Sequence, residues 1–343
     1  MIHNNDTGNV AVDFYHRYPE DFRTAIELSA KIVRISISWA RIYPNGDGAI
    51  NQAGLDHYLN MVDEALAIGL QPVVTCYHWD LPQALQDRFG GWNSEEIVPI
   101  FANYTATVYE ALGDKVMEQA ANCTLNVLKS HAASVKEFRK LVPGGMISMN
   151  LNAEWALPKD PNSEADKAAV IRKMELPYLP EISPELAKDL AGSMDYLALN
   201  HYTSTVVNFK AGGMSPLDWL YSVPWGFRAL LNYLNVRYKP DEISITENGY
   251  TVKGEDNMSI DEALNDTARI KYLKGYLDAA TEAFYYDKVP IKNYCAWALM
   301  DNFEWQDGYS KHFGVMRVNR TTQLRTKKAS ARYLADRFSM NAQ

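Results

Sequence analysis

The sequence alternates between strand-like and helix-like segments, and this alternation limits the possible folds more than any other feature. Strand-like runs that are apolar on both faces are separated by amphipathic stretches, for example between Leu55 and Leu70, where apolar residues recur with the period of a helix. Such runs are typical of parallel strands that are covered by helices on both faces. The strand-like runs span residues 32–44, 71–80, 146–156, 195–204, 242–250 and 293–305.

Polar and aromatic residues gather where these runs end, as in "YHWD" and "ENGY". In a (β/α)8 barrel the active site lies at the carboxyl ends of the strands. We therefore predict an α/β fold, a (β/α)8 TIM barrel in a single domain over residues 1–343, with six of its eight strands recognisable. One missing strand falls near Val116–Met117, where "GDKVMEQ" joins two helix-like stretches without a strand between them. The other missing strand is expected before Met1.

Composition narrows the class of partner. The net charge of −8 disfavours nucleic acid and suits a neutral small molecule. Nothing approaches the ~20 consecutive apolar residues of a membrane span, and the N-terminal segment lacks the features of a signal peptide. A cytoplasmic protein is therefore expected. Cys76, Cys123 and Cys295 lie far apart without metal-like spacing, so we expect free thiols and no metal or cofactor. Composition says nothing about the oligomeric state.

Five short motifs carry a more specific signal. In chain order they are "YHWDLPQAL", "GGW", "LNHYTS", "ITENGY" and "DNFEWQDGYSKHFG". With them, the sequence from about Asn5 to Phe338 resembles glycoside hydrolase family 1, and most of all its eukaryotic β-glucosidases. The resemblance implies a retaining enzyme that hydrolyses β-D-glucosides or oligosaccharides without a metal or cofactor.

The same resemblance assigns roles to individual residues. It implies that Glu247 in "ITENG" is the nucleophile, which attacks the anomeric carbon and forms a covalent intermediate that water later releases. Arg34 and Tyr202 match the family positions that contact this carboxylate, and such partners favour its charged form. A carboxylate at Glu304 would repel a 6-phosphate, so unphosphorylated glucosides are expected. The residues that match the family's sugar-binding positions are His78, Asn200, Trp297, Glu304, Trp305 and Phe313.

The sequence also departs from the family. Family members carry an Asn-Glu-Pro triplet on the fourth strand, whose Glu is the general acid/base, and this triplet occurs nowhere in the sequence. They also carry a sugar-binding Gln on the first strand, and this sequence begins after that strand. Glu154 is the one weak candidate for a substitute acid. Either segments of a longer protein are omitted here, or the chain is a shortened product.

Three functions remain open. The first is a β-glucosidase that works through Glu247 and is impaired by the absent acid/base. The second is a catalytically inactive pseudoglycosidase that binds a sugar or a protein partner. A third, a sugar-binding module of unrelated fold, would leave "ITENGY" and "DNFEWQDGY" unexplained.

Overall fold

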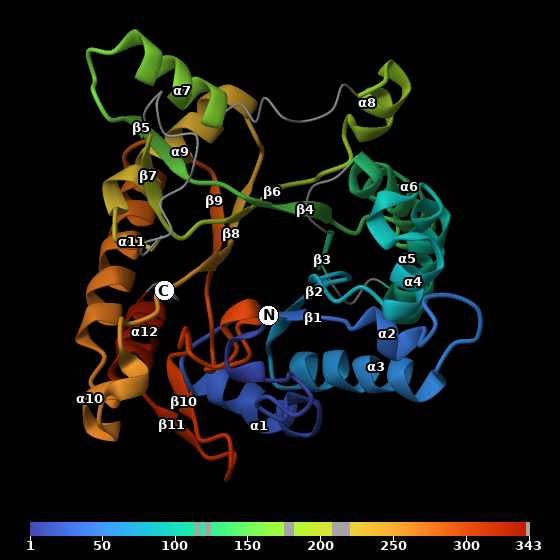
Figure 1. Cartoon of the computed structure of the whole chain (residues 1–343), viewed down its shortest axis with the longest axis horizontal. Coiled ribbons are helices and arrows are strands. Elements are labelled where there is room, and N and C mark those ends of the chain that lie inside the picture. Colours follow the sequence, from blue (N-terminus) through green and yellow to red (C-terminus); the bar gives the residue numbers. More distant parts are fainter. Residues whose placement is uncertain (114–116, 121–124, 175–181, 208–219, 341–343) are drawn as a thin grey trace.

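A curved parallel sheet forms the centre of the molecule (Figure 1). The computed structural model describes residues 1–113, 117–120, 125–174, 182–207 and 220–340. Within these residues, seven strands form one sheet in the order β1-β2-β3-β4-β6-β8-β9, and every neighbouring pair is parallel. Their bounds are β1 Ile32–Ser36, β2 Gln71–Thr75, β3 Met117–Ala120, β4 Ile147–Asn152, β6 Leu197–Asn200, β8 Ile243–Asn248 and β9 Ile291–Ala296.

Helices lie around the outside of these strands (Figure 1). They are α1 Phe14–Glu27, α2 Trp39–Ile42, α3 Gln52–Ala67, α4 Gln83–Phe89, α5 Ile97–Leu112, α6 Leu125–Leu141, α7 Glu164–Met174, α8 Pro184–Leu190, α9 Pro224–Tyr238, α10 Ile260–Leu264, α11 Thr267–Tyr285 and α12 Ala329–Met340. Two small sheets are added, one of β5 Trp155–Pro158 with β7 Ser204–Val207 and one of β10 Met316–Val318 with β11 Arg325–Lys327.

The strand order and the helical connections are those of a (β/α)8 barrel, as the sequence predicts. The strands β1 and β9, which stand at the two ends of the strand order, lie in contact with each other, so the sheet curves round a common interior. The carboxyl ends of the parallel strands therefore meet at one end of the barrel, where a barrel enzyme keeps its active site.

The prediction that no strand lies near Val116–Met117 was wrong. The backbone of β3 pairs with β2 on one side and with β4 on the other. The sequence of β3 is Met-Glu-Gln-Ala, and these residues favour a helix over a strand, so the local pattern contains no strand signal. Pairing on both edges outweighs this weak local preference. Val116 itself lies outside the described residues.

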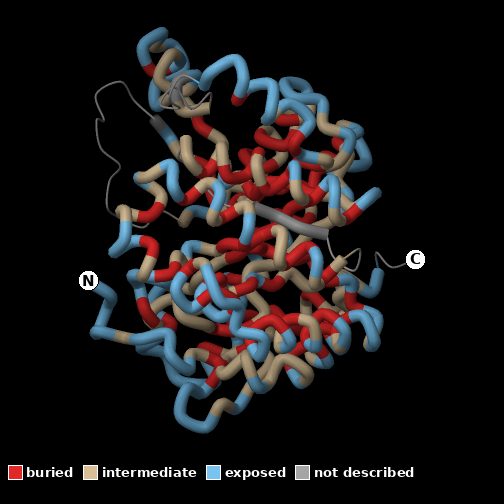
Figure 2. The backbone as a smooth tube through the Cα atoms, turned by 90° about the vertical axis from the view of Figure 1, so that its right-hand side faces the viewer, coloured by how far each residue is buried: buried red, intermediate tan, exposed pale blue. Residues whose placement is uncertain are grey.

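The apolar core consists of two clusters, one built from the N-terminal half of the chain and one built mainly from the C-terminal half. The N-terminal cluster includes Phe22, Trp39 and Tyr104, and the rings of Trp39 and Tyr104 stack with their centroids 4.9 Å apart. The C-terminal cluster includes Phe227 and Tyr272. Buried residues fill the interior of the molecule, whereas exposed residues lie mainly on its outside (Figure 2). Aromatic packing of this kind stabilises a core beyond the area that it buries.

Two smaller expectations concern cysteines and membranes. Cys76 and Cys295 form no disulfide bond among the described residues, as the sequence predicts, and Cys123 lies outside those residues. Among the described helices, none combines the length and the apolar character that crossing a membrane requires.

Candidate active site

Glu247 lines a cavity at the carboxyl ends of the strands, although strand periodicity alone would point it elsewhere. Ile243 and Ile245 of β8 pack into the C-terminal cluster, and strict alternation would turn Glu247 to the same side. The pairing register of β8 with β9 shifts after Ile245, and such an irregularity re-aims the next side chains. The Glu247 carboxylate consequently faces the cavity, whose volume is about 230 Å³.

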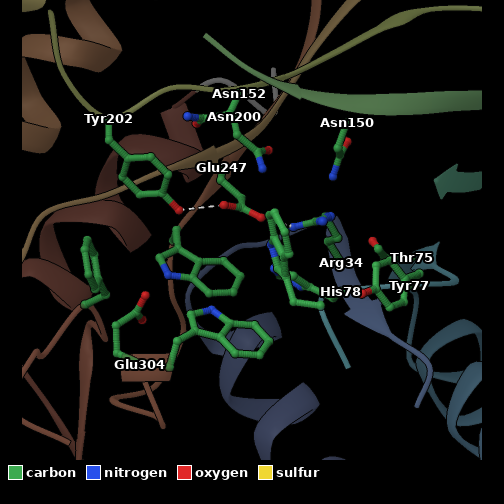
Figure 3. A pocket seen from close by; sticks show the side chains of 14 residues that line it. Arg34, Thr75, Tyr77, His78, Asn150, Asn152, Asn200, Tyr202, Glu247 and Glu304 are labelled. Atoms are coloured by element: carbon green, nitrogen blue, oxygen red, sulfur yellow. Dashed lines mark hydrogen bonds and ion pairs between the residues drawn. The ribbon is translucent and has the colours of Figure 1, made fainter. Parts of the chain in front are cut away.

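Two donors hold the Glu247 carboxylate (Figure 3). Arg34 Nη1 on β1 donates to Oε1 at 2.5 Å, and the Tyr202 hydroxyl after β6 donates to Oε2 at 2.6 Å. The side chains of Arg34 and Glu247 are only 8% and 7% exposed, so this is a buried ion pair. Burial and the negative charge of Glu247 raise the pKa of Tyr202 well above its usual value, so the hydroxyl keeps its proton. The two contacts that the resemblance implies are therefore present.

Hydrogen bonds behind the cavity position Tyr202. The Tyr272 hydroxyl of α11 donates to the backbone oxygen of Tyr202 at 2.5 Å. The backbone nitrogen of His201 donates to the backbone oxygen of Glu247 at 2.9 Å, and the side-chain amide of Asn248 donates to the backbone oxygen of His201 at 2.6 Å. The end of β6 is thus tied to the end of β8, which aligns the tyrosine with the carboxylate.

An aromatic wall forms another side of the cavity. The His78 ring lies against Trp297 and Trp305, with centroid distances of 5.8 and 5.7 Å. Burial, and then the positive charge of Arg34, lower the pKa of His78 to about 4, so the imidazole is neutral at pH 7 and offers one donor and one acceptor. A Cβ at Gly249 would lie 1.8 Å from the Trp297 oxygen, so the glycine in "ENG" allows this close approach.

Glu304 is the second carboxyl group of the cavity. Burial, followed by the negative charges of Glu247 and Asp307, raises its pKa from 4.5 to about 7, against a hydrogen bond with Trp297 that lowers it. The group therefore changes its charge near neutral pH, where its neighbour Glu247 makes a second negative charge unfavourable.

This shift predicts a pH-dependent stability. Because the pKa of Glu304 is raised in the folded state, its contribution to stability is present below pH 4.5 and is lost as the pH rises through about 7. The side chain in the Glu304→Gln variant cannot ionise. Between those pH values, the free energy of unfolding of the unmutated chain should therefore fall by up to about 3 kcal/mol relative to that of the variant. Urea unfolding of both proteins at several pH values measures the difference. A difference that does not change with pH would contradict the shift.

Every residue that the resemblance assigns to the nucleophile or to the sugar lies at this one cavity. Phe313 and Asn200 line it, and the Thr246 hydroxyl donates to the Asn200 side-chain oxygen at 2.7 Å. The sequence motifs do not identify Thr75, Asn150 and Asn152, which also line the cavity. Their sequence signal is weak, because they are only polar residues near the ends of strands, at alternate positions of β4 in the case of the two asparagines.

Glu154, the candidate for a substitute acid, is not among the lining residues. Its carboxylate accepts a hydrogen bond from Lys173 Nζ at 2.9 Å, and its side chain is 24% exposed. Glu154 therefore forms an ion pair that connects the residue before β5 to α7.

A buried charged group supports the loop that carries Glu304 and Phe313. The Lys328 ammonium contacts Glu255 at 2.6 Å and Asp301 at 2.9 Å. Glu255, Asp301 and His312 lie close enough together to hold a metal ion, but the lysine already supplies a positive charge to two of them. This arrangement is that of a structural ion-pair network.

Comparisons with known proteins agree with this geometry. The sequence profile of Glycosyl hydrolase family 1 matches residues 1–126 and 169–342. The chain is 32% identical to "Beta-glucosidase 4" of Oryza sativa subsp. japonica, over 96% of this chain and 85% of the relative. It is 33% identical to "Beta-glucosidase A" of Thermotoga maritima, over 96% of this chain and 87% of the relative.

Solved structures give the same result. The GH1 β-glucosidase of the fungus Humicola insolens, in complex with glucose, matches with a TM-score of 0.91 and 33% identity, over 99% of this chain and 90% of that chain. The alignment with the rice relative extends over 412 residues, more than the 343 residues of this chain, so parts of the relative have no counterpart here. The profile, the relatives and the fold agree, and the chain therefore belongs to glycosyl hydrolase family 1, whose relatives named here are β-glucosidases.

Proposed function

We propose that this chain is a retaining β-glucosidase that keeps its nucleophile, Glu247, but has no general acid/base. Such an enzyme releases only leaving groups that depart without a proton. The observation that carries the proposal is the Glu247 carboxylate, held by Arg34 and Tyr202 inside a cavity with an aromatic wall. The solved relative from Humicola insolens contains glucose, which supports a glucose-sized ligand.

The first step of the proposed reaction needs no further group. A Glu247 oxygen attacks the anomeric carbon, the bond to the leaving-group oxygen breaks, and its electron pair stays on that oxygen. Arg34 and Tyr202 hold the carboxylate in position for this attack. Trp297 packs against the apolar face of the sugar, while His78 and Glu304 bind its hydroxyls.

Among the described residues, the site lacks a carboxyl group assigned as the general acid/base. A retaining glycosidase needs it about 5–5.5 Å from the nucleophile, to protonate the leaving group and then to activate water. Among the described residues that line the cavity, Glu304 is the only other acidic side chain. Its place in the resemblance is on the distal hydroxyls of the sugar. The loss of general acid–base help is expected to slow ordinary substrates by about 10²–10⁴-fold.

Two substrates with different leaving groups test the proposal. The purified chain should release dinitrophenol from dinitrophenyl β-glucoside but should hydrolyse cellobiose at least about 10²-fold more slowly than an enzyme with the acid/base. Azide, which attacks without a general base, should accelerate release of the sugar from Glu247.

Two other results would change the proposal. Efficient turnover of cellobiose would contradict the missing acid/base. The activities of the variants Glu304→Gln and Glu118→Gln would then show which carboxyl group acts as the acid. Glu118 belongs to β3, and its side chain lies outside the described residues. No release of dinitrophenol above the uncatalysed rate, with or without azide, would instead favour the inactive sugar-binding protein.

A further inference from the structure

Asn150 of β4 carries a buried amide without a hydrogen-bond partner among the described residues. The residue is only 5% exposed, and neither Nδ2 nor Oδ1 bonds to another group in the described structure. An unsatisfied buried amide is unfavourable, and most buried polar side chains in proteins are paired. The unpaired amide of Asn150 does not stabilise the fold, so its presence needs another explanation.

The amide belongs to the cavity. Ser148 and Asn150 lie on the same face of β4, and the Ser148 hydroxyl donates to the Tyr196 oxygen at 2.6 Å. Ile147, on the opposite face, packs into the N-terminal cluster. Asn150 lines the same cavity as Glu247, and its amide projects into that space from β4 (Figure 3).

A second buried asparagine shows what a structural amide looks like in this barrel. The Asn248 Nδ2 atom donates to the His201 oxygen at 2.6 Å and to the Tyr272 hydroxyl at 3.0 Å. Its Oδ1 atom accepts a hydrogen bond from the Tyr294 hydroxyl at 2.5 Å. The protein satisfies Asn248, whereas Asn150 lines the cavity and neither of its polar atoms is paired by the described residues.

We propose that Asn150 is a sugar-binding residue, whose amide both donates to and accepts from hydroxyls of a glucoside bound beside Glu247. A sugar hydroxyl is a donor and an acceptor, as is an amide, so the two groups satisfy each other. An apolar ligand group at this position would leave the amide unpaired. The proposal rests on the proposed function, and it adds recognition from β4 that the family resemblance does not assign.

Asn150→Leu tests this role, because leucine has a similar size and no polar atom. The ligand-free variant should have an unchanged or higher Tm, since an unsatisfied amide is removed. Glucose affinity, measured by calorimetry, should fall roughly 5- to 150-fold, as expected for two lost hydrogen bonds. A set of monodeoxyglucoses adds a specific readout: the unmutated chain should bind at least one more weakly than glucose, and Asn150→Leu should lose that discrimination.

Asn248→Leu is the matched control, because it removes a buried amide that the protein does pair; its Tm should fall by several degrees. A similar fall in the Tm of Asn150→Leu would show that the Asn150 amide stabilises the fold, and would overturn the proposal. Unchanged glucose binding by Asn150→Leu would overturn it while leaving the proposed function intact. A parent chain that binds no glucose would overturn both.

Discussion

Glu247→Gln should abolish the release of dinitrophenol from dinitrophenyl β-glucoside. An amide cannot attack the anomeric carbon, so the rate should fall by about 10⁴-fold or more, as it does when nucleophiles are removed from other covalent enzymes. The substitution keeps the size of the side chain and an acceptor for Arg34, so folding should be preserved. Stopped assays with the activated substrate measure the loss.

A trapping experiment identifies the attacking residue directly. A dinitrophenyl 2-deoxy-2-fluoro-glucoside should leave one sugar covalently attached to the unmutated chain, detectable by intact mass, and none on Glu247→Gln. Glu154→Gln is the control, because Glu154 pairs with Lys173 away from the cavity, and this variant should be labelled normally. Labelling of Glu247→Gln would assign the nucleophile to another residue.

Arg34→Met should lower the free energy of unfolding by about 3–5 kcal/mol. The substitution leaves the buried Glu247 carboxylate without its ion-pair partner, and an uncompensated buried charge is strongly destabilising. The remaining bond from Tyr202 supplies no positive charge. Urea unfolding at neutral pH measures the change.

The double variant Arg34→Met with Glu247→Gln separates the charge from the packing. Because no buried charge is left unpaired, most of the stability lost in Arg34→Met should return. If the two substitutions instead destabilise additively, the pair is not a coupled ion pair, and the position of Glu247 depends on other contacts.

The sequence predicted the barrel and most of the site because both depend on patterns within short segments. Strand-like segments such as 71–80 contain a short apolar run between polar ends, and Glu247 stands in a recognisable motif. The strand β3 could not be predicted, because its four residues favour a helix and only pairing with β2 and β4 makes them extended.

Other properties of the site depend on contacts between distant segments. The direction of Glu247 follows from a register shift in the pairing of β8, which the alternation within "ISITENG" does not contain. The raised pKa of Glu304 and the unpaired amide of Asn150 likewise depend on which groups come to surround them. A single sequence describes neighbours along the chain, and these features concern neighbours in space.

The Arg34–Glu247 ion pair also has a consequence for how the protein folds. The two residues are 213 positions apart, and their strands pack into different core clusters, Ile35 of β1 into the N-terminal one and Ile245 of β8 into the C-terminal one. Contacts of such large sequence separation form slowly, because a long loop must be closed first. Helices within each half can form early from local contacts, whereas the cavity around Glu247 exists only after both halves have docked. Formation of this cavity therefore marks the last stage of assembly and comes later than the formation of secondary structure.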